Sequence, residues 1–159
     1  MENKLKEVIK YSKYQTIVLV LLRLVVGYHF LFEGIDKLLS PSWTSSGFLL
    51  QTNWLFSDIF HFLANNPTML SIVDMLNIWG QILIGVSLIL GLFSTMAAIF
   101  GALMLFMYYI AIPPFIESYI FIDKNLLELF AFLIIALFPT SKILGIDLLL
   151  EKFRSIGNG

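Results

Sequence analysis

The chain has 159 residues, a length that suits one domain. Hydrophobic residues make up 58% of it and charged residues only 13%, whereas a soluble domain carries about 25% charged residues to keep its surface wet. This composition excludes an ordinary soluble domain, and the net charge of −1 argues against a nucleic-acid partner. The absence of cysteine excludes disulfides and thiolate metal sites. We therefore expect an all-α integral membrane protein.

Four segments are apolar enough to cross a bilayer, whose hydrocarbon core requires a helix of roughly 20 residues. In chain order they cover about residues 14–39, 68–92, 95–112 and 125–138. The first follows a lysine-rich tail, but it has no small-residue cleavage site, so we expect it to be retained rather than removed as a signal peptide. The sequence thus predicts a four-helix membrane bundle that forms one domain over residues 1–159.

Two capping patterns mark the starts of predicted spans. Asn66 precedes Pro67, which is typical of a capping residue followed by proline at the first helical position. The spacing Asn125-x-x-Glu128 is typical of a capping box, and it predicts the start of the fourth span.

The connections carry further predictions. Residues 40–66 are too apolar for an open loop and predict one or two short helices at the membrane surface. In residues 146–153 the charged residues Asp147, Glu151 and Lys152 lie opposite the leucines on a helix, which predicts another interfacial helix. Basic residues gather in the two tails and are absent from residues 40–66, so we expect both termini to be cytoplasmic, in a bacterial-type inner membrane. These basic residues are Lys4, Lys6, Lys10, Lys13, Lys142, Lys152 and Arg154.

Arg23 is the most informative polar residue, because it lies roughly 15 Å inside the first span at 1.5 Å per residue. An arginine there costs about 2.5–3.5 kcal/mol, so it must face the bundle interior and find acceptors. Gln81 is expected at about the same depth. Arg23 is either a structural hub that ties helices together or part of a ligand site. The predicted ligand-binding residues are Arg23, Gly27, Gly34, Gln81, Tyr108 and Tyr109; the glycines leave room for another helix or a ligand.

A second set of polar residues is predicted near the outer surface. The set consists of Glu33, Lys37, Lys124, Asn125 and Glu128. Glu33 and Lys37 have the i,i+4 spacing of a helix-supporting ion pair, and Glu128 has the spacing of a helix cap. His29 and Glu33 share a helix face, but the only other histidine lies in a loop, so we expect no metal site.

Several runs resemble DoxX-type membrane proteins. Residues 22–27 (LRLVVG) and 32–38 (FEGIDKL) resemble the first helix of that family, residues 85–92 are similar to its second helix, and residues 123–128 look like the start of its last helix. The resemblance implies a four-helix inner-membrane bundle and a link to redox chemistry, because the family is named after a subunit of a thiosulfate:quinone oxidoreductase. The chain departs from the family in having Gln81 where a glutamate is common, and Ser94-Thr95 where Thr-Arg is common.

The leading functional hypothesis is a small membrane subunit that binds a lipophilic ligand, favoured to be a quinone. Arg23 would donate to a quinone carbonyl, Gln81 and one tyrosine would orient the ring, and Glu128 and Lys124 would pass protons near the outer surface. We expect no intrinsic cofactor, and as partners membrane lipids with a redox protein or a second copy of the chain. The alternatives are a non-enzymatic scaffold or assembly subunit, in which Arg23 is a clamp, and a small-molecule transporter. The transporter is disfavoured because no pair of broken helices is evident.

Overall fold

A computed structural model describes residues 11–112 and 122–157 of the chain, except for the side chains of residues 151 and 154–157. The described part is all-helical. Its elements are α1 (Lys13–Leu39), α2 (Ser46–Leu50), α3 (Ser57–Asn65), α4 (Pro67–Leu90), α5 (Ser94–Ala111), α6 (Lys124–Leu137), the short 3-10 helix η2 (Thr140–Lys142) and α7 (Ile146–Gly157). Short helices are therefore present in both segments where the sequence predicted them, within residues 40–66 and after residue 145.

Three helices are long and apolar enough to cross a membrane, namely α1, α4 and α5. Their bounds lie within two residues of the predicted spans. The fourth predicted span is not confirmed, because α6 has only 14 residues and measures about 21 Å at 1.5 Å per residue, less than the roughly 30 Å of a hydrocarbon core. The chain is a helical membrane protein with three candidate spans, and α6 lies against α5 as a shorter fourth helix.

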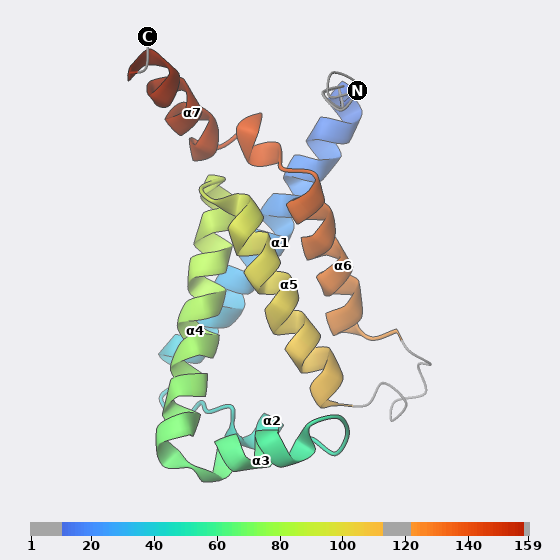
Figure 1. Ribbon diagram of the computed structural model, residues 1–159, viewed down its shortest axis with the longest axis vertical. Coiled ribbons are helices and arrows are strands. Elements are labelled where there is room, and N and C mark those ends of the chain that lie inside the picture. The colour runs from blue at the N-terminus through green and yellow to red at the C-terminus, as the bar shows by residue number, and fades with distance from the viewer. Residues whose placement is uncertain (1–10, 113–121, 158–159) are drawn as a thin grey trace, which may run out of the picture.

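The helices define two ends of the molecule (Figure 1). The start of α1, the turn between α4 and α5, the end of α6 and all of α7 lie at one end, which we call the terminal end. The short helices α2 and α3 lie across the opposite end, which we call the α2–α3 end. The helices α4 and α5 are close together at their turn and separate towards the α2–α3 end. The candidate site is lined by residues of α1, α4, α5 and α6.

One of the two predicted capping signals marks a helix start correctly and the other does not. The side chain of Asn66 accepts hydrogen bonds from the backbone of Thr68 and Met69, so α4 begins as predicted. The capping box predicted at Asn125-x-x-Glu128 is wrong. α6 is instead capped by Asp123, whose carboxylate accepts from the backbone N–H of Leu126 at 2.8 Å. A carboxylate one residue outside the helix can reach this donor directly, which leaves Glu128 available for another partner.

Glycines allow α1 and α4 to pack closely. A Cβ atom at Gly34 would lie 2.7 Å from the side chain of Ile82, and one at Gly27 would lie 2.9 Å from Leu88. Helices in lipid gain little from hydrophobic burial, so close backbone approach at small residues provides much of their packing energy. Of the two occupants that the sequence allowed beside these glycines, another helix or a ligand, the structure shows the helix.

Candidate functional site

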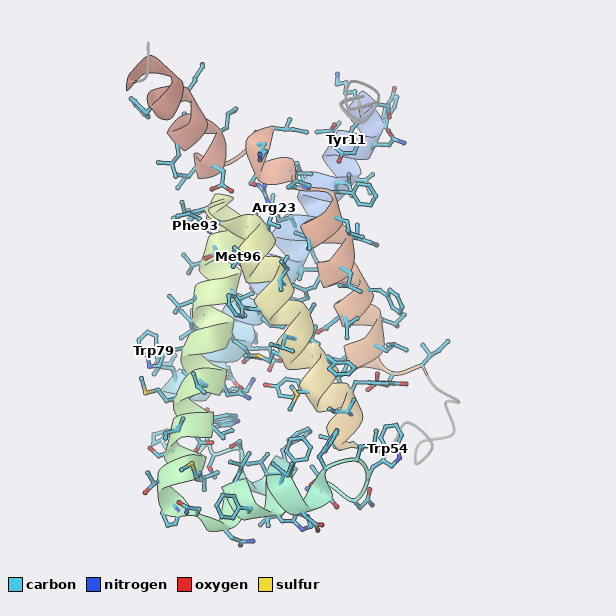
Figure 2. The ribbon with its side chains drawn as sticks, viewed as in Figure 1. Tyr11, Arg23, Trp54, Trp79, Phe93 and Met96 are labelled. Atoms are coloured by element: carbon cyan, nitrogen blue, oxygen red, sulfur yellow. The ribbon has the colours of Figure 1, made fainter. Side chains whose placement is uncertain are left out.

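Arg23 is buried at the terminal end, with 1% of its surface exposed, close to the α4–α5 turn (Figure 2). Its Nη1 donates to the Thr140 hydroxyl at 3.2 Å and its Nη2 donates to the backbone carbonyl of Leu144 at 2.7 Å. A Cβ atom added at Gly91, in the turn, would lie 3.2 Å from the guanidinium. Arg23 thereby connects α1 to the segment that joins α6 to α7.

The expected common depth of Arg23 and Gln81 is wrong. Arg23 lies beside Gly91, at the end of α4, whereas Gln81 lies about 15 Å further along that helix at 1.5 Å per residue. The cause is that the start of α1 extends beyond the α4–α5 turn (Figure 1). Counting residues from the start of each span therefore placed the two side chains at one level when they are not.

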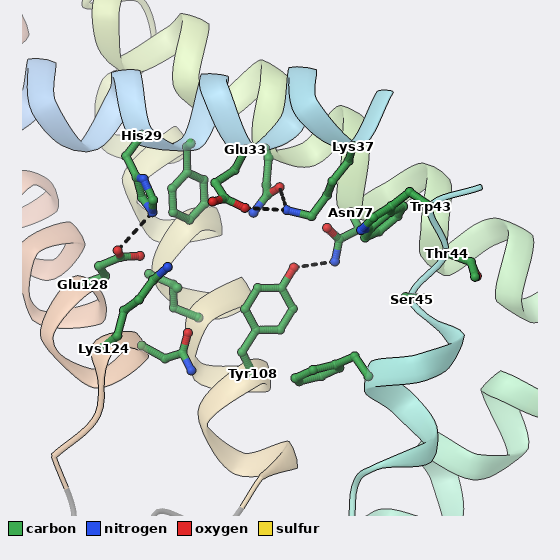
Figure 3. A pocket seen from close by; sticks show the side chains of 15 residues that line it. His29, Glu33, Lys37, Trp43, Thr44, Ser45, Asn77, Tyr108, Lys124 and Glu128 are labelled. Atoms are coloured by element: carbon green, nitrogen blue, oxygen red, sulfur yellow. Dashed lines mark hydrogen bonds and ion pairs between the residues drawn. The ribbon is translucent and has the colours of Figure 1, made fainter. Parts of the chain in front are cut away.

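A polar cavity of about 270 Å³, which we call the chamber, lies nearer the α2–α3 end. Figure 3 shows the charged and polar side chains that point into it from α1, α4, α5 and α6. Its lining residues are His29, Phe30, Glu33, Lys37, Trp43, Thr44, Ser45, Phe48, Asn77, Gln81, Leu105, Tyr108, Lys124, Asn125 and Glu128. All five members of the predicted outer polar set are among them, so helices far apart in sequence bring these residues together.

Lys37 is the central donor of the chamber. Its Nζ donates to Glu33 Oε2 at 2.9 Å and to Gln81 Oε1 at 2.8 Å, and it lies 5.6 Å from the centre of the Trp43 ring. The first contact confirms the predicted i,i+4 pair. An ammonium group has three donors. Lys37 uses two of them in hydrogen bonds with described residues, so within the described part of the chain one N–H is left for a further acceptor in the chamber.

A second ionic contact joins α1 to α6. His29 Nε2 lies 3.1 Å from Glu128 Oε1, and Lys124 extends towards the same space from the first turn of α6 (Figure 3). Whether His29 is neutral or protonated, a ring N–H at Nε2 can donate to the carboxylate. Two basic and two acidic side chains therefore face one small cavity, in addition to the imidazole.

Tyr108 and Asn77 join α5 to α4 through a hydrogen bond from the Asn77 amide to the Tyr108 hydroxyl. The hydroxyl accepts in this bond, so its own hydrogen can be donated to another group. The side-chain oxygen of Asn77 is buried and has no hydrogen-bond partner among the described residues. If the amide oxygen and nitrogen of Asn77 were exchanged, an N–H donor rather than an oxygen acceptor would be left without a partner. In either orientation of the amide, Asn77 can therefore still form a hydrogen bond with a ligand.

The α1–α2 connection and the start of α2 line the chamber at the α2–α3 end. The backbone N–H and hydroxyl of Ser45 both donate to Asp74 Oδ1, at 2.7 and 2.5 Å, and the Phe48 ring packs edge-on against the Tyr108 ring. The sequence analysis named Tyr108 as a ligand-binding residue but did not identify Ser45 or Phe48 as part of the site. Asn77 had a detectable signal, because it lies one helical turn before Gln81 on the same face, whereas Ser45 and Phe48 had none.

The predicted ligand-binding residues fall into two groups. Gln81 and Tyr108 line the chamber, whereas Arg23, Gly27, Gly34 and Tyr109 do not. No group of three or more metal-ligating side chains is present among the described residues.

The described fold is that of a helical membrane protein with a charged chamber among its helices. The sequence model of the DoxX family matches residues 18–113, which is more than half of the chain. The protein therefore belongs to the DoxX family. Searches of curated proteins and of solved structures return no match.

Proposed function

We propose that this protein binds a membrane-soluble ligand whose polar head carries a hydrogen-bond-accepting carbonyl, and that the ligand is a quinone. The observation that supports the proposal is the chamber itself, in which Lys37 and Tyr108 each retain a donor beside an apolar wall formed by Phe30, Phe48 and Leu105. A volume of about 270 Å³ lies just below the roughly 300–1,000 Å³ of sites for drug-sized ligands, which suits one ring rather than a whole lipid.

The chemistry of a quinone matches these donors. A carbonyl oxygen accepts hydrogen bonds in the oxidised ring and gains negative charge on reduction, so preorganised donors stabilise the reduced forms more strongly. In the proposal Lys37 and Tyr108 contact the carbonyl, and His29 with Glu128 exchanges protons with the ring. Arg23, which the sequence hypothesis placed at the carbonyl, is replaced in this role because its terminal nitrogens contact Thr140 and Leu144.

Fluorescence of Trp43 provides a direct test. The chain has three tryptophans, so replacing Trp54 and Trp79 by phenylalanine leaves Trp43 as the reporter beside Lys37. In this background, titration with decylubiquinone should quench Trp43 and saturate. Lys37→Met should weaken binding by roughly 10–100-fold, because a hydrogen bond to a charged group contributes about 1.5–3 kcal/mol.

Two controls make the result specific. Lys13→Met removes a lysine from the other end of the same helix and should leave the affinity unchanged. Glu33→Gln combined with Lys37→Met removes the partner that would otherwise be left unpaired, so a loss of binding in both Lys37 variants is a loss of the donor. Unsaturable quenching, or equal affinity in Lys37→Met and its parent, would contradict the proposal.

We further propose that the terminal end faces the cytoplasm, which places the chamber near the outer surface of the inner membrane. The lysine-rich tails support this orientation. Electrons for any reaction of the bound ring would come from a redox partner protein. Since the chain lacks cysteine, single cysteines at Gly47 in α2 and at Lys152 in α7 can be labelled separately in whole cells by an impermeant maleimide. We expect labelling at position 47 alone. Labelling at position 152 alone would show that the terminal end faces outward, opposite to the proposal.

A scaffold function is the second candidate, because the contacts of Arg23 with Thr140 and Leu144 are those of a structural clamp. If the protein is a scaffold, partner proteins should be lost from the purified complex when Arg23 is replaced by methionine. It also expects them to be retained in Lys37→Met, which would separate it from a function carried by the chamber.

A further inference from the structure

An apolar crevice lies between α4 and α5, next to the chamber. It has a volume of about 570 Å³, and its rim residues Leu76, Leu83, Leu103 and Met107 are each more than 40% exposed. Gly80 lies in its wall, where a side chain would approach Met104. The described residues place this crevice where α4 and α5 diverge (Figure 1).

The crevice opens onto the membrane rather than onto water. Both of its walls belong to candidate membrane-spanning helices, and its rim is formed by leucine and methionine side chains. Such a surface offers water no hydrogen-bond partners. The hydrocarbon chains of the bilayer surround membrane-spanning helices at this depth. The lining of the crevice therefore suits a hydrocarbon chain.

The crevice adjoins the chamber, and the two share a wall. Ser45, Phe48, Asn77 and Tyr108 line both cavities, so the Asn77–Tyr108 hydrogen bond lies at the boundary between the polar space and the apolar one. A molecule with a polar ring and an apolar tail fits this arrangement: its ring would occupy the chamber and its tail the neighbouring crevice.

We propose that the crevice between α4 and α5 binds the hydrocarbon tail of the ligand whose head occupies the chamber, and that this ligand enters and leaves sideways from the membrane. The proposal rests on the proposed function and adds to it the tail site and the route. The ligand class is a long-tailed quinone, as opposed to a small polar solute that enters from water.

A photoreactive quinone with a diazirine at the end of a decyl tail tests the inference on the full-length protein in nanodiscs. Mass spectrometry should locate the cross-links on crevice residues such as Leu83, Phe100 and Leu103, and an excess of decylubiquinone should abolish them. A phospholipid with a diazirine in its acyl chain is the comparison probe. If it labels the same residues equally, and decylubiquinone does not compete, an ordinary lipid fills the crevice and the inference is overturned.

Variants of the crevice provide the second arm. Gly80→Phe fills the crevice and should abolish tail cross-linking there, whereas Val86→Phe adds the same ring on the lipid-facing side of α4 and should not. Leu103→Phe adds an aromatic ring at the exposed rim and keeps the test usable if Gly80→Phe fails to fold. Unchanged cross-linking in both filled variants would overturn the inference.

The tailless dimethoxy-methyl-benzoquinone ring separates the two proposals. It should still quench Trp43 in the Leu103→Phe variant, which adds no second tryptophan to the reporter background, because Leu103 does not line the chamber. If the ring binds but the tail cross-links elsewhere, the tail site is wrong and the proposed function stands. If neither the ring nor decylubiquinone quenches Trp43, the proposed function itself fails.

Discussion

Replacing Arg23 by methionine separates the structural role of this residue from ligand binding. Methionine fills a similar volume and tolerates irregular surroundings, so the change removes the charge and the donors with little loss of packing. The structure assigns two hydrogen bonds to the guanidinium, one to Thr140 Oγ1 and one to the Leu144 carbonyl. We expect a less stable protein whose chamber is intact, because Lys37 lies about 21 Å further along α1 at 1.5 Å per residue.

The expected change in the free energy of unfolding is the difference between two opposing contributions. Each hydrogen bond from a charged donor contributes about 1.5–3 kcal/mol, so two of them contribute about 3–6 kcal/mol. Removing the arginine also removes the cost of placing a charge within the membrane, which is about 2.5–3.5 kcal/mol at the centre and falls towards the surface. The expected net loss is about 1–3 kcal/mol in the free energy of unfolding.

The assay combines global stability with local protection. Denaturant unfolding in detergent gives the global value, and hydrogen exchange should show faster opening of residues 138–147. This region includes the backbone bond from the Asp147 N–H to the Gly91 carbonyl, 3.0 Å long. Arg23→Lys keeps the charge but cannot donate to both acceptors as a fork, so its stability should lie between those of the parent and of Arg23→Met.

Two outcomes would refute this reasoning. Unchanged stability together with unchanged exchange in residues 138–147 would show that the two hydrogen bonds contribute nothing to the native state. A folded Arg23→Met protein that no longer quenches Trp43 with decylubiquinone would return Arg23 to the ligand site and contradict the placement of that site in the chamber.

The remaining predictions concern the chamber and the packing around it. Tyr108→Phe should weaken decylubiquinone binding by about 2–10-fold, the effect of about 0.5–1.5 kcal/mol for a neutral hydrogen bond, whereas Tyr109→Phe should not change it. Gly101→Ala should destabilise the protein by about 1–3 kcal/mol in the unfolding assay, because the added methyl group overlaps the Phe132 ring. Gly47→Ala is the control: its methyl group would meet no neighbouring atom within 4 Å, so the change should be neutral or slightly stabilising. Asp74→Ala removes the acceptor of both Ser45 hydrogen bonds and should increase hydrogen exchange in residues 44–50; unchanged exchange would exclude this tether.

Much of the fold was predictable because hydrocarbon imposes simple requirements on a chain. The spans had to be long apolar runs, and the Asn66-Pro67 signal marked the start of α4 correctly. The fourth span is not confirmed, because α6 has the 14 residues that the sequence predicted and is short for a helix that crosses the bilayer. The capping box was wrong because two adjacent capping signals competed at the start of α6, and the carboxylate of Asp123 prevailed.

The candidate site was only partly predictable, since it depends on how far each helix slides past its neighbours. The polar set that includes Glu33, Lys37 and Glu128 was expected near one surface, and these residues do line one cavity. The prediction that Arg23 and Gln81 lie at about the same depth was wrong, because their relative depth depends on how far α1 extends beyond the α4–α5 turn and not on composition. The contribution of Ser45 had no sequence signal, because it depends on the path of the connection over α4.

A density map of the protein in lipid nanodiscs with decylubiquinone tests the central claim most directly. The account predicts ring density in the chamber, with a carbonyl oxygen within hydrogen-bond distance of Lys37 Nζ and Tyr108 Oη. Ring density beside Arg23, or a chamber that excludes the ring at saturating quinone, would contradict it.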